Sequence, residues 1–273
     1  MDAVFFLKHS EANDLEIRYA LRGIARHAPW IHKVWILGDR PAFLTHDVRV
    51  AEHMPDDLMA WVGPYQTPVR NFFLMFYLMA LTPEIENEIL FFSDDFILLR
   101  DLSPENARIV RYLQDLNLVK SRGRGLWKES LWRTYDLLRR FGYETLNYET
   151  HVPTYFQKRW ILDAVRDFRD FITEDRFYGM LALTAIFNHA RRQHKFPVTH
   201  LEEENSRAGF YGKAPTTAEI HDAVIDRSFL GFDEGGFGED LRMFLANRFP
   251  EPCMYEREGE GIGLETFRVA TGE

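Results

Sequence analysis

Residues 89–99 read ILFFSDDFILL, so two adjacent aspartates stand between two runs of four apolar residues. The apolar runs predict buried strands, which places Asp94 and Asp95 at the tip of the first one. Removing one carboxylate from water beside apolar strands is costly, and a second carboxylate next to it adds like-charge repulsion. A divalent cation between them removes both penalties, so the pair is a candidate metal site. A surface turn between two strands, where Asp is common, fits the same residues.

The bulk composition allows a sizeable core and one large α/β domain. The chain has 273 residues, of which 46% are hydrophobic and 15% aromatic. Its single cysteine, Cys253, excludes an internal disulfide framework and favours a reducing compartment. No basic segment precedes an apolar stretch at the start, and the apolar run 71–81 is shorter than the roughly 20 residues that cross a bilayer. We therefore expect a cytoplasmic location and no transmembrane segment, while oligomeric state is not predicted.

The net charge of −9 argues mildly against a protein that coats nucleic acid. A local basic groove stays compatible with it, because basic residues gather in two segments, 120–128 and 191–195. Solvated loop and helix ends are the commoner explanation for both clusters. Nucleic acid is therefore an alternative partner that the charge balance does not favour.

The order of predicted elements follows an α/β pattern. Strands are predicted at 3–8, 33–38, 48–50 and 89–92, an amphipathic helix follows the candidate N-cap Asp14, and residues 71–81 predict a fully buried helix. This order predicts a mostly parallel, Rossmann-type sheet with right-handed crossovers. Ligands of such sheets bind at the carboxyl ends of the strands, where His9, Asp39 and Asp94 stand.

Helical spacing prevails in the second half of the chain. Residues 129–140, 155–168 and 178–193 each show it. The two tryptophans Trp127 and Trp132 either stack on an acceptor or belong to the core, and the core is the commoner place for such residues. The second half is therefore predicted to be a helical insertion.

Four blocks of sequence occur in a recognisable order. They are residues 14–39 (DLEIRYALRGIARHAPWIHKVWILGD), 91–96 (FFSDDF), 148–153 (YETHVP), and 228–233 (SFLGFD) together with 248–256 (RFPEPCMYE). In this order they resemble the Stealth-type capsular polysaccharide transferases, which share a helix reading E-L-x-Y-S-L-R-S-I before A-P-W-I, then Y-x-N-D-D-x-F, a His-x-Pro block and a terminal F-x-x-x-N-D block. The matches extend from about residue 3 to residue 256.

The resemblance implies a GT-A-like fold and transfer from a nucleotide sugar, most commonly a UDP-sugar, with Mn²⁺ or Mg²⁺, to a hydroxyl of a glycan or another acceptor. Stealth proteins transfer a sugar phosphate, whereas related proteins with the same core are ordinary glycosyltransferases. The phosphotransferases carry a Glu in the helix before the Asp-Asp strand, and residues 72–81 contain no acidic residue. We therefore expect glycosyl transfer, with sugar-1-phosphate transfer as the first alternative and transfer to hydroxymethylated DNA bases as the second.

The resemblance also implies roles for single residues. Asp94 and Asp95 correspond to the metal site, His151 to the general base, Asp233 to a polar residue near the metal or acceptor, and Arg176 to a phosphate-contacting arginine. His151 also suits the role of base on chemical grounds, because its ordinary pKa lies near 6.5, while a structural loop histidine is the alternative.

The donor side completes the expected site. His9, Asp39, Arg70, Asn71 and Asp94 are expected around the donor nucleotide, although Asp39 equally fits a turn before a proline. We expect one GT-A-like domain over 1–273, with a nucleotide-binding part at about 1–105. A helical acceptor-side part would follow at about 106–225, and a C-terminal segment at about 226–273.

Overall fold

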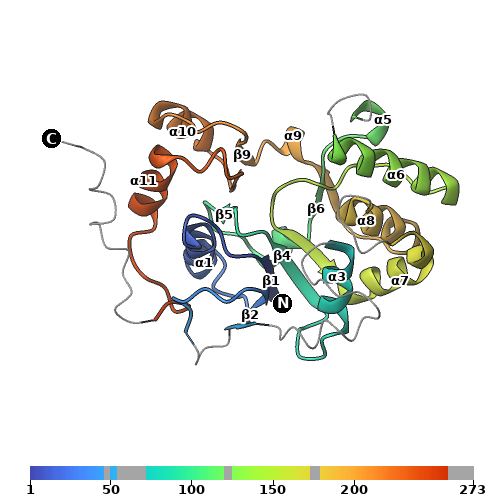
Figure 1. Cartoon of the computed structure of the whole chain (residues 1–273), viewed down its shortest axis with the longest axis horizontal. Coiled ribbons are helices and arrows are strands. Elements are labelled where there is room, and N and C mark those ends of the chain that lie inside the picture. Colours follow the sequence, from blue (N-terminus) through green and yellow to red (C-terminus); the bar gives the residue numbers. More distant parts are fainter. Residues whose placement is uncertain (46–49, 54–71, 120–124, 173–178, 258–273) are drawn as a thin grey trace.

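The computed structural model describes residues 1–45, 50–53, 72–119, 125–172 and 179–257 (Figure 1). The strands are β1 (Asp2–Leu7), β2 (Val34–Gly38), β3 (Val50–His53), β4 (Glu88–Phe92), β5 (Phe96–Leu98), β6 (Val110–Tyr112), β7 (Thr154–Gln157), β8 (Val198–His200), β9 (Arg207–Phe210) and β10 (Phe229–Phe232). The helices are α1 (Leu15–His27), α3 (Phe72–Leu81), α4 (Pro104–Ala107), α5 (Leu116–Val119), α6 (Leu126–Phe141), α7 (Lys158–Phe168), the 3₁₀ helix η2 (Arg169–Phe171), α8 (Ala182–Gln193), α9 (Leu201–Glu204), α10 (Thr217–Val224) and α11 (Glu239–Arg248).

The central sheet has the strand order β3-β2-β1-β4-β7, and its first four strands run parallel. This confirms the predicted mostly parallel sheet. The last strand, β7, is antiparallel to β4, with Phe91 paired with Thr154. The carboxyl end of β4 therefore lies beside the amino end of β7, which brings two loops distant in sequence to one end of the sheet.

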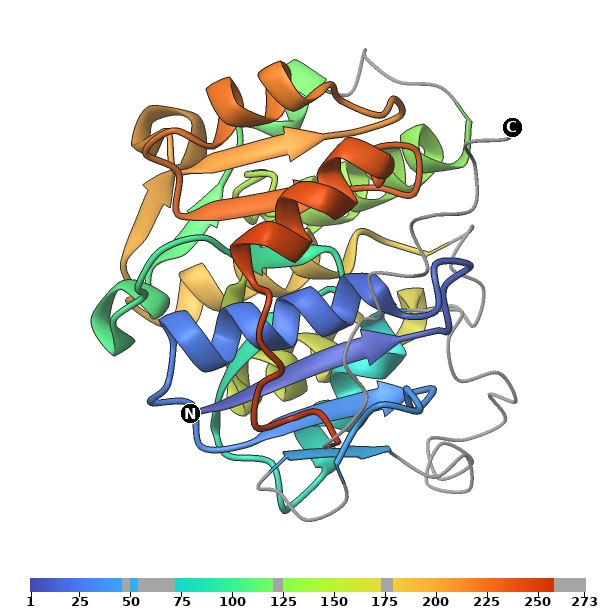
Figure 2. The ribbon, with the colours of Figure 1, turned by 90° about the vertical axis from the view of Figure 1, so that its left-hand side faces the viewer.

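Helices cover both faces of this sheet. Helix α1 lies on one face, and α3 with α7 lies on the other (Figures 1 and 2). Helix α3 consists of apolar residues on all sides, and most of its residues are buried. This confirms the predicted buried helix. The ring of Phe76 packs against Phe6, Phe91 and Phe156, with centroids 4.8, 4.9 and 4.9 Å apart.

The second half is less helical than predicted. Helices α6, α7 and α8 are present, but residues 155–157 belong to β7, and α7 begins only at Lys158. This part of the chain also contributes three strands that were not predicted, namely β8, β9 and β10. Strands β9 and β10 form a three-stranded sheet with β5, and β8 pairs with β6. Each of these strands pairs with a segment far away in the chain, and local spacing does not reveal such pairing.

Gly38 at the end of β2 and Asp14 just before α1 fix the local structure of the first βαβ unit. Gly38 has φ +131°, and a Cβ there would lie 1.9 Å from the Leu7 carbonyl oxygen, so only glycine lets β2 pass β1 at this point. Asp14 stands just before α1, as predicted, but its side chain makes no capping hydrogen bond. It instead accepts from the backbone N–H of Ser10 at 3.0 Å and lies 2.7 Å from His9 Nδ1.

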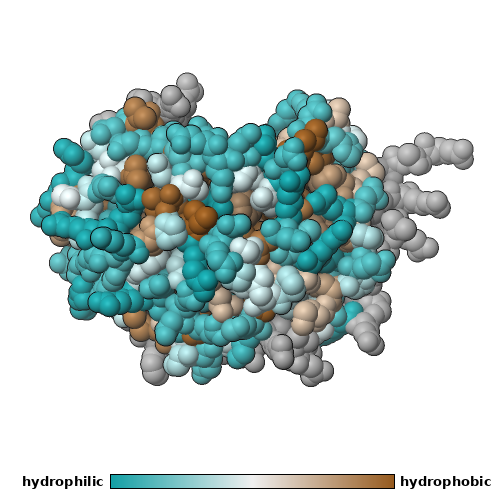
Figure 3. Space-filling view, turned by 180° about the vertical axis from the view of Figure 1, so that it is seen from behind, coloured by the Kyte–Doolittle hydropathy of each residue, from teal (hydrophilic) through white to brown (hydrophobic). Residues whose placement is uncertain are grey.

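The surface is polar for the most part. Figure 3 shows the face opposite to that in Figure 1 as mainly hydrophilic, with hydrophobic residues in small separate groups. Of the helices in the described ranges, none combines the length and the apolar character needed to cross a lipid bilayer.

Candidate functional site

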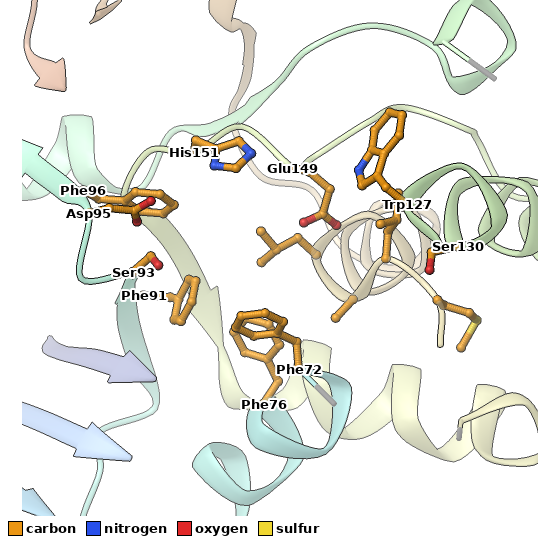
Figure 4. Close-up of a pocket in the computed structure, with 14 residues that line it drawn as sticks. Phe72, Phe76, Phe91, Ser93, Asp95, Phe96, Trp127, Ser130, Glu149 and His151 are labelled. Carbon is orange, nitrogen blue, oxygen red and sulfur yellow. The ribbon is translucent and has the colours of Figure 1, made fainter. Parts of the chain in front are cut away.

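Two cavities meet at Asp95, at the carboxyl end of the central sheet. Cavity A has a volume of about 500 Å³, and its charged lining residues are Lys8, His9, Glu11, Glu16, Asp94, Asp95, Asp233, Glu234 and Arg242. Cavity B has a volume of about 420 Å³, and its lining includes Phe72, Phe76, Phe91, Ser93, Asp95, Phe96, Trp127, Ser130, Glu149 and His151 (Figure 4). Asp95 therefore faces a mainly charged space on one side and a mainly aromatic space on the other.

The topology explains why these residues meet. His9 follows β1 and Asp94 follows β4, and both strands are parallel neighbours whose carboxyl ends share one edge. His151 precedes β7, which runs the other way, so its loop arrives at the same edge. The sequence predicted the first two placements from the strand order. It placed His151 there only through the resemblance.

Asp94 and Asp95 have raised pKa values, a condition that a nearby divalent cation would relieve. Burial, and then the nearby Glu16 carboxylate, raise the pKa of Asp94 to about 6. Burial, and then the Asp94 carboxylate, raise the pKa of Asp95 to about 7. Asp95 Oδ1 is buried and has no hydrogen-bond partner in the described part of the chain. These carboxylates fit a divalent cation, whose charge would favour their ionised forms.

A second acidic group lies at the opposite end of the sheet. Oxygen or nitrogen atoms of Asp2, His32 and Glu86 come within 4.8 Å of one another. Asp2 Oδ1 is buried without a hydrogen-bond partner among the described residues, but the other atoms already have partners. The Trp35 indole N–H donates to Asp2 Oδ2 at 2.9 Å, and the α-amino group of Met1 forms an ion pair with Glu86 at 2.5 Å. We therefore assign no cation to this cluster.

His151 has a strained backbone and a free ring. Its φ is +54°, a left-handed conformation that costs a non-glycine residue about 1 kcal/mol or more. The imidazole packs against Phe96 and Tyr211, with centroids 6.1 and 5.3 Å away, and makes no hydrogen bond to the described residues. Desolvation, and then the Arg207 guanidinium, lower the pKa of His151, while Asp233 acts in the opposite direction. The ring is thus neutral near pH 7 and able to accept a proton.

Gly231 in β10 allows the close approach that holds this loop. A Cβ at this position would lie 2.6 Å from the Tyr211 hydroxyl and 3.0 Å from the His151 carbonyl oxygen. The flexible end of Tyr211 can move away, but the backbone oxygen cannot. Any larger side chain at Gly231 would therefore displace His151.

Three further predicted residues lie at or next to cavity A. Asp233 lines it, but both of its carboxylate oxygens accept from the Gly212 N–H at 2.8 Å, and one also accepts from the Gly236 N–H at 2.8 Å. It therefore stabilises a turn at the rim. His9 lines the cavity, and Asp39 supports it by accepting from the His9 N–H at 2.9 Å. The predicted Arg70, Asn71 and Arg176 lie outside the described residues, as do Lys120, Arg122 and Arg124 of the basic segment.

Sequence reasoning missed several lining residues of cavity A. Glu16, in the first turn of α1, accepts from the Ser10 hydroxyl at 2.7 Å and faces Asp94. Lys8 and Arg242 supply positive charge, and the Arg242 guanidinium lies 4.8 Å from the centre of the Phe237 ring. Glu16 and Lys8 sit at the carboxyl end of β1 and the helix that follows, so the strand order alone could have identified them. Arg242 lies in α11, outside the predicted strand order, so nothing in the sequence pointed to it.

Sequence reasoning also missed Glu149 and misplaced Trp127. Glu149 lies two residues before His151 in the same block, its carboxyl group lines cavity B, and burial raises its pKa to about 7. Trp127 is 42% exposed and lines cavity B, and Trp132 is 37% exposed on the outside of α6. The expectation that these tryptophans belong to the core is wrong, because α6 turns this face outward.

Comparisons with known proteins connect this geometry to transferases. No family model matches the chain. It is 22% identical over 270 residues to an exopolysaccharide phosphotransferase of Nocardia farcinica (strain IFM 10152), a match that covers 89% of this chain and 53% of that protein. The bifunctional glycosyltransferase WbbM superposes with a TM-score of 0.50 at 12% identity, over 92% of this chain and 50% of WbbM. The fold is GT-A-like. A further match, at a TM-score of 0.45 and 14% identity, is the galactosyltransferase LgtC, over 92% of this chain and 97% of LgtC.

The chain spans about half the length of the exopolysaccharide phosphotransferase and of WbbM. At 12% identity, the likeness to WbbM concerns the fold, and the fold prediction is thereby confirmed. The activity of this chain has to be argued from its own two cavities.

Proposed function

We propose that this chain is a metal-dependent glycosyltransferase that moves a sugar from a nucleotide sugar, most commonly a UDP-sugar, to a hydroxyl group of a glycan acceptor. The observation that carries the proposal is the position of Asp95, which lines both cavities. A group-transfer enzyme needs two binding spaces that share one reaction centre. Cavity A is assigned to the donor and cavity B to the acceptor.

Cavity A suits a nucleoside diphosphate. Asp94 and Asp95 would hold Mn²⁺ or Mg²⁺ there, and the bound cation would stabilise the charge that develops on the leaving diphosphate. Lys8 and Arg242 add positive charge to the same lining. His9 lines the same cavity and Asp39 accepts from its backbone N–H, and we assign this pair to hydroxyl groups of the donor.

Cavity B suits an acceptor whose hydroxyl group loses a proton during transfer. His151 lines this cavity with a neutral ring and no hydrogen bond to the described residues, so its lone pair is available. A base within hydrogen-bond reach of the acceptor hydroxyl contributes on the order of 10²–10⁴ in rate. Asp233 acts on the donor side by holding the rim turn, and Arg176 stays a proposed phosphate contact.

Sugar-1-phosphate transfer is the second candidate. The relative that matches 89% of this chain is named an exopolysaccharide phosphotransferase, and the four Stealth-type blocks point the same way. Against it, helix α3 carries no acidic residue where the phosphotransferases place a Glu. The two reactions differ in which bond of the donor breaks, and this difference is measurable.

The test is to incubate the protein with a panel of nucleotide sugars and Mn²⁺ and to identify the nucleotide released. Glycosyl transfer releases the nucleoside diphosphate, whereas sugar-phosphate transfer releases the monophosphate. Asp95→Asn should abolish turnover while the circular dichroism spectrum stays unchanged. Metal-independent turnover, or full activity of this variant, would refute the assignment of Asp95.

A further inference from the structure

Cavity B carries acidic groups without described basic partners. Its lining includes the carboxyl groups of Asp95 and Glu149, and no Lys or Arg lines it within the described ranges. Asp95 is shared with the cation proposed for cavity A, so Glu149 is the acidic group that a ligand of cavity B meets by itself. A second negative charge beside Glu149 in a partly desolvated space would be costly. Cavity A differs, because Lys8 and Arg242 lie among its acidic residues.

Glu149 is held so that one side of its carboxyl group remains open to the cavity. One oxygen, Oε1, accepts from the backbone N–H of Thr184 at 3.2 Å, near the start of α8. The backbone N–H of Glu149 donates to Asn147 Oδ1 at 3.0 Å, which fixes the loop behind it. The other oxygen, Oε2, has no hydrogen bond to the described residues. The carboxyl group is thus positioned to receive a hydrogen bond from a ligand.

Aromatic rings form the walls on either side of this carboxyl group. Figure 4 shows Glu149 between His151 and Trp127, with Phe72, Phe76 and Phe91 across the cavity. Trp127 is 42% exposed and Phe72 50% exposed, so flat apolar surfaces are presented to a ligand. A pyranose ring has apolar C–H faces and a rim of hydroxyl groups, and it fits such walls. The volume of about 420 Å³ is within the range of small-molecule pockets, roughly 300–1,000 Å³.

We propose that cavity B binds the acceptor through a pyranose ring that carries no negative charge, and that Glu149 holds one of its hydroxyl or amino groups beside His151. This inference rests on the proposed function, since it names the class of acceptor for the same site. Glu149 acts in binding and positioning, and the proton of the reacting hydroxyl group goes to His151.

Binding of three matched probes tests the inference without requiring turnover. The probes are methyl glucoside, methyl glucosaminide and methyl glucuronide, which are neutral, cationic and anionic pyranosides. Their Kd values are measured by ligand-observed NMR in metal-free buffer, for the wild-type chain and for E149Q, W127A and E144Q. Glu144 is an exposed residue paired with Arg191, so E144Q is the matched control for loss of one negative charge. W127A changes an exposed residue and provides a second variant should E149Q fold poorly.

The wild-type chain is expected to bind the glucoside and the glucosaminide at least about tenfold more tightly than the glucuronide. E149Q should raise the Kd of the glucosaminide about tenfold and should reduce the difference in Kd between the glucuronide and the other two probes. W127A should raise the Kd values of the glucoside and the glucosaminide about threefold or more. E144Q should leave both of these Kd values unchanged. Equal binding of all three probes, binding of none, or unchanged Kd values in both E149Q and W127A would overturn the inference. UDP and Mn²⁺ binding, measured on the same variants, reports on cavity A, so failure of the donor assignment is seen separately.

Discussion

Arg22 and Glu256 form an ion pair in which both side chains are buried, with Nε 2.6 Å from Oε1 and Nη2 2.8 Å from Oε2. Arg22 belongs to the first block of the Stealth-type resemblance, and Glu256 belongs to the last. The pair holds the C-terminal segment against α1, and neither residue lines cavity A or cavity B. These two motif residues therefore have a structural role, unlike His151 and Asp95.

Glu256→Gln should lower the free energy of unfolding by about 3–5 kcal/mol, because it leaves the buried charge of Arg22 without its partner. Urea unfolding followed by circular dichroism measures this change. The exposed Glu251 offers a control, since Glu251→Gln should stay within about 0.5 kcal/mol of the wild type. A loss below about 1 kcal/mol for Glu256→Gln would show that the pair contributes little.

Asp95→Asn should make the metal-free protein more stable while it abolishes transfer. The wild-type carboxylate is repelled by Asp94 and has a buried oxygen without a partner, so the neutral amide relieves a cost of about 1 kcal/mol. Thermal unfolding with and without Mn²⁺ and UDP tests this. The wild type should gain stability from the additives, and the variant should not. A destabilised variant that still responds to Mn²⁺ would contradict the assignment.

His151→Ala should reduce transfer by about 10²–10⁴ and leave UDP binding unchanged, because the proposed base would act only on the acceptor. The pKa of His151 is lowered, so the neutral, active form persists below pH 6.5 and the rate should fall only as pH drops through that lower value. Arg207→Met removes a charge that lowers this pKa, and the acid limb of the rate profile should move to higher pH. A limb that does not respond to Arg207 would mean that another group titrates.

Glu88 should contribute to stability in a pH-dependent way. Two hydrogen bonds from Arg108, both 2.9 Å long, and one from Tyr155 at 2.6 Å lower the pKa of Glu88 from 4.5 to about 2. Since the folded pKa is depressed, the contribution is complete above about pH 4.5 and disappears as pH falls through 2. The pair is about one third exposed, so Glu88→Gln should cost about 1 kcal/mol or less near pH 7 and almost nothing near pH 2. Urea unfolding at the two pH values measures the difference, and an equal loss at both would contradict the ion-pair explanation.

The first half of the fold was predictable because its signals are local. Strands β1, β2 and β4 are continuous apolar runs, and α3 is too uniformly apolar to be anything but buried. The second half was less predictable because its strands depend on distant partners. Residues 155–157 look helical in spacing, yet their pairing with β4 makes them a strand.

The candidate site shows the same division. Asp94 and Asp95 could be identified from the apolar runs beside them, and His9 from the end of β1. Glu149, Arg242 and the exposed face of Trp127 could not, because their importance comes from cavities that only the tertiary structure creates. The resemblance located His151, for which the residues alone left a structural role open.

The antiparallel register of β4 and β7 has a consequence for how proteins with this arrangement can diversify. Asp95 lies a few residues after Phe91, His151 lies a few residues before Thr154, and Phe91 and Thr154 are paired directly. The segment between Asp95 and His151 can therefore become longer or shorter, or be exchanged, without changing the separation of these two residues, because the pairing of Phe91 with Thr154 fixes it. If the proposed roles hold, replacement of that segment would change the acceptor preference, while the spacing between the proposed base and the proposed metal-binding carboxylate would stay the same.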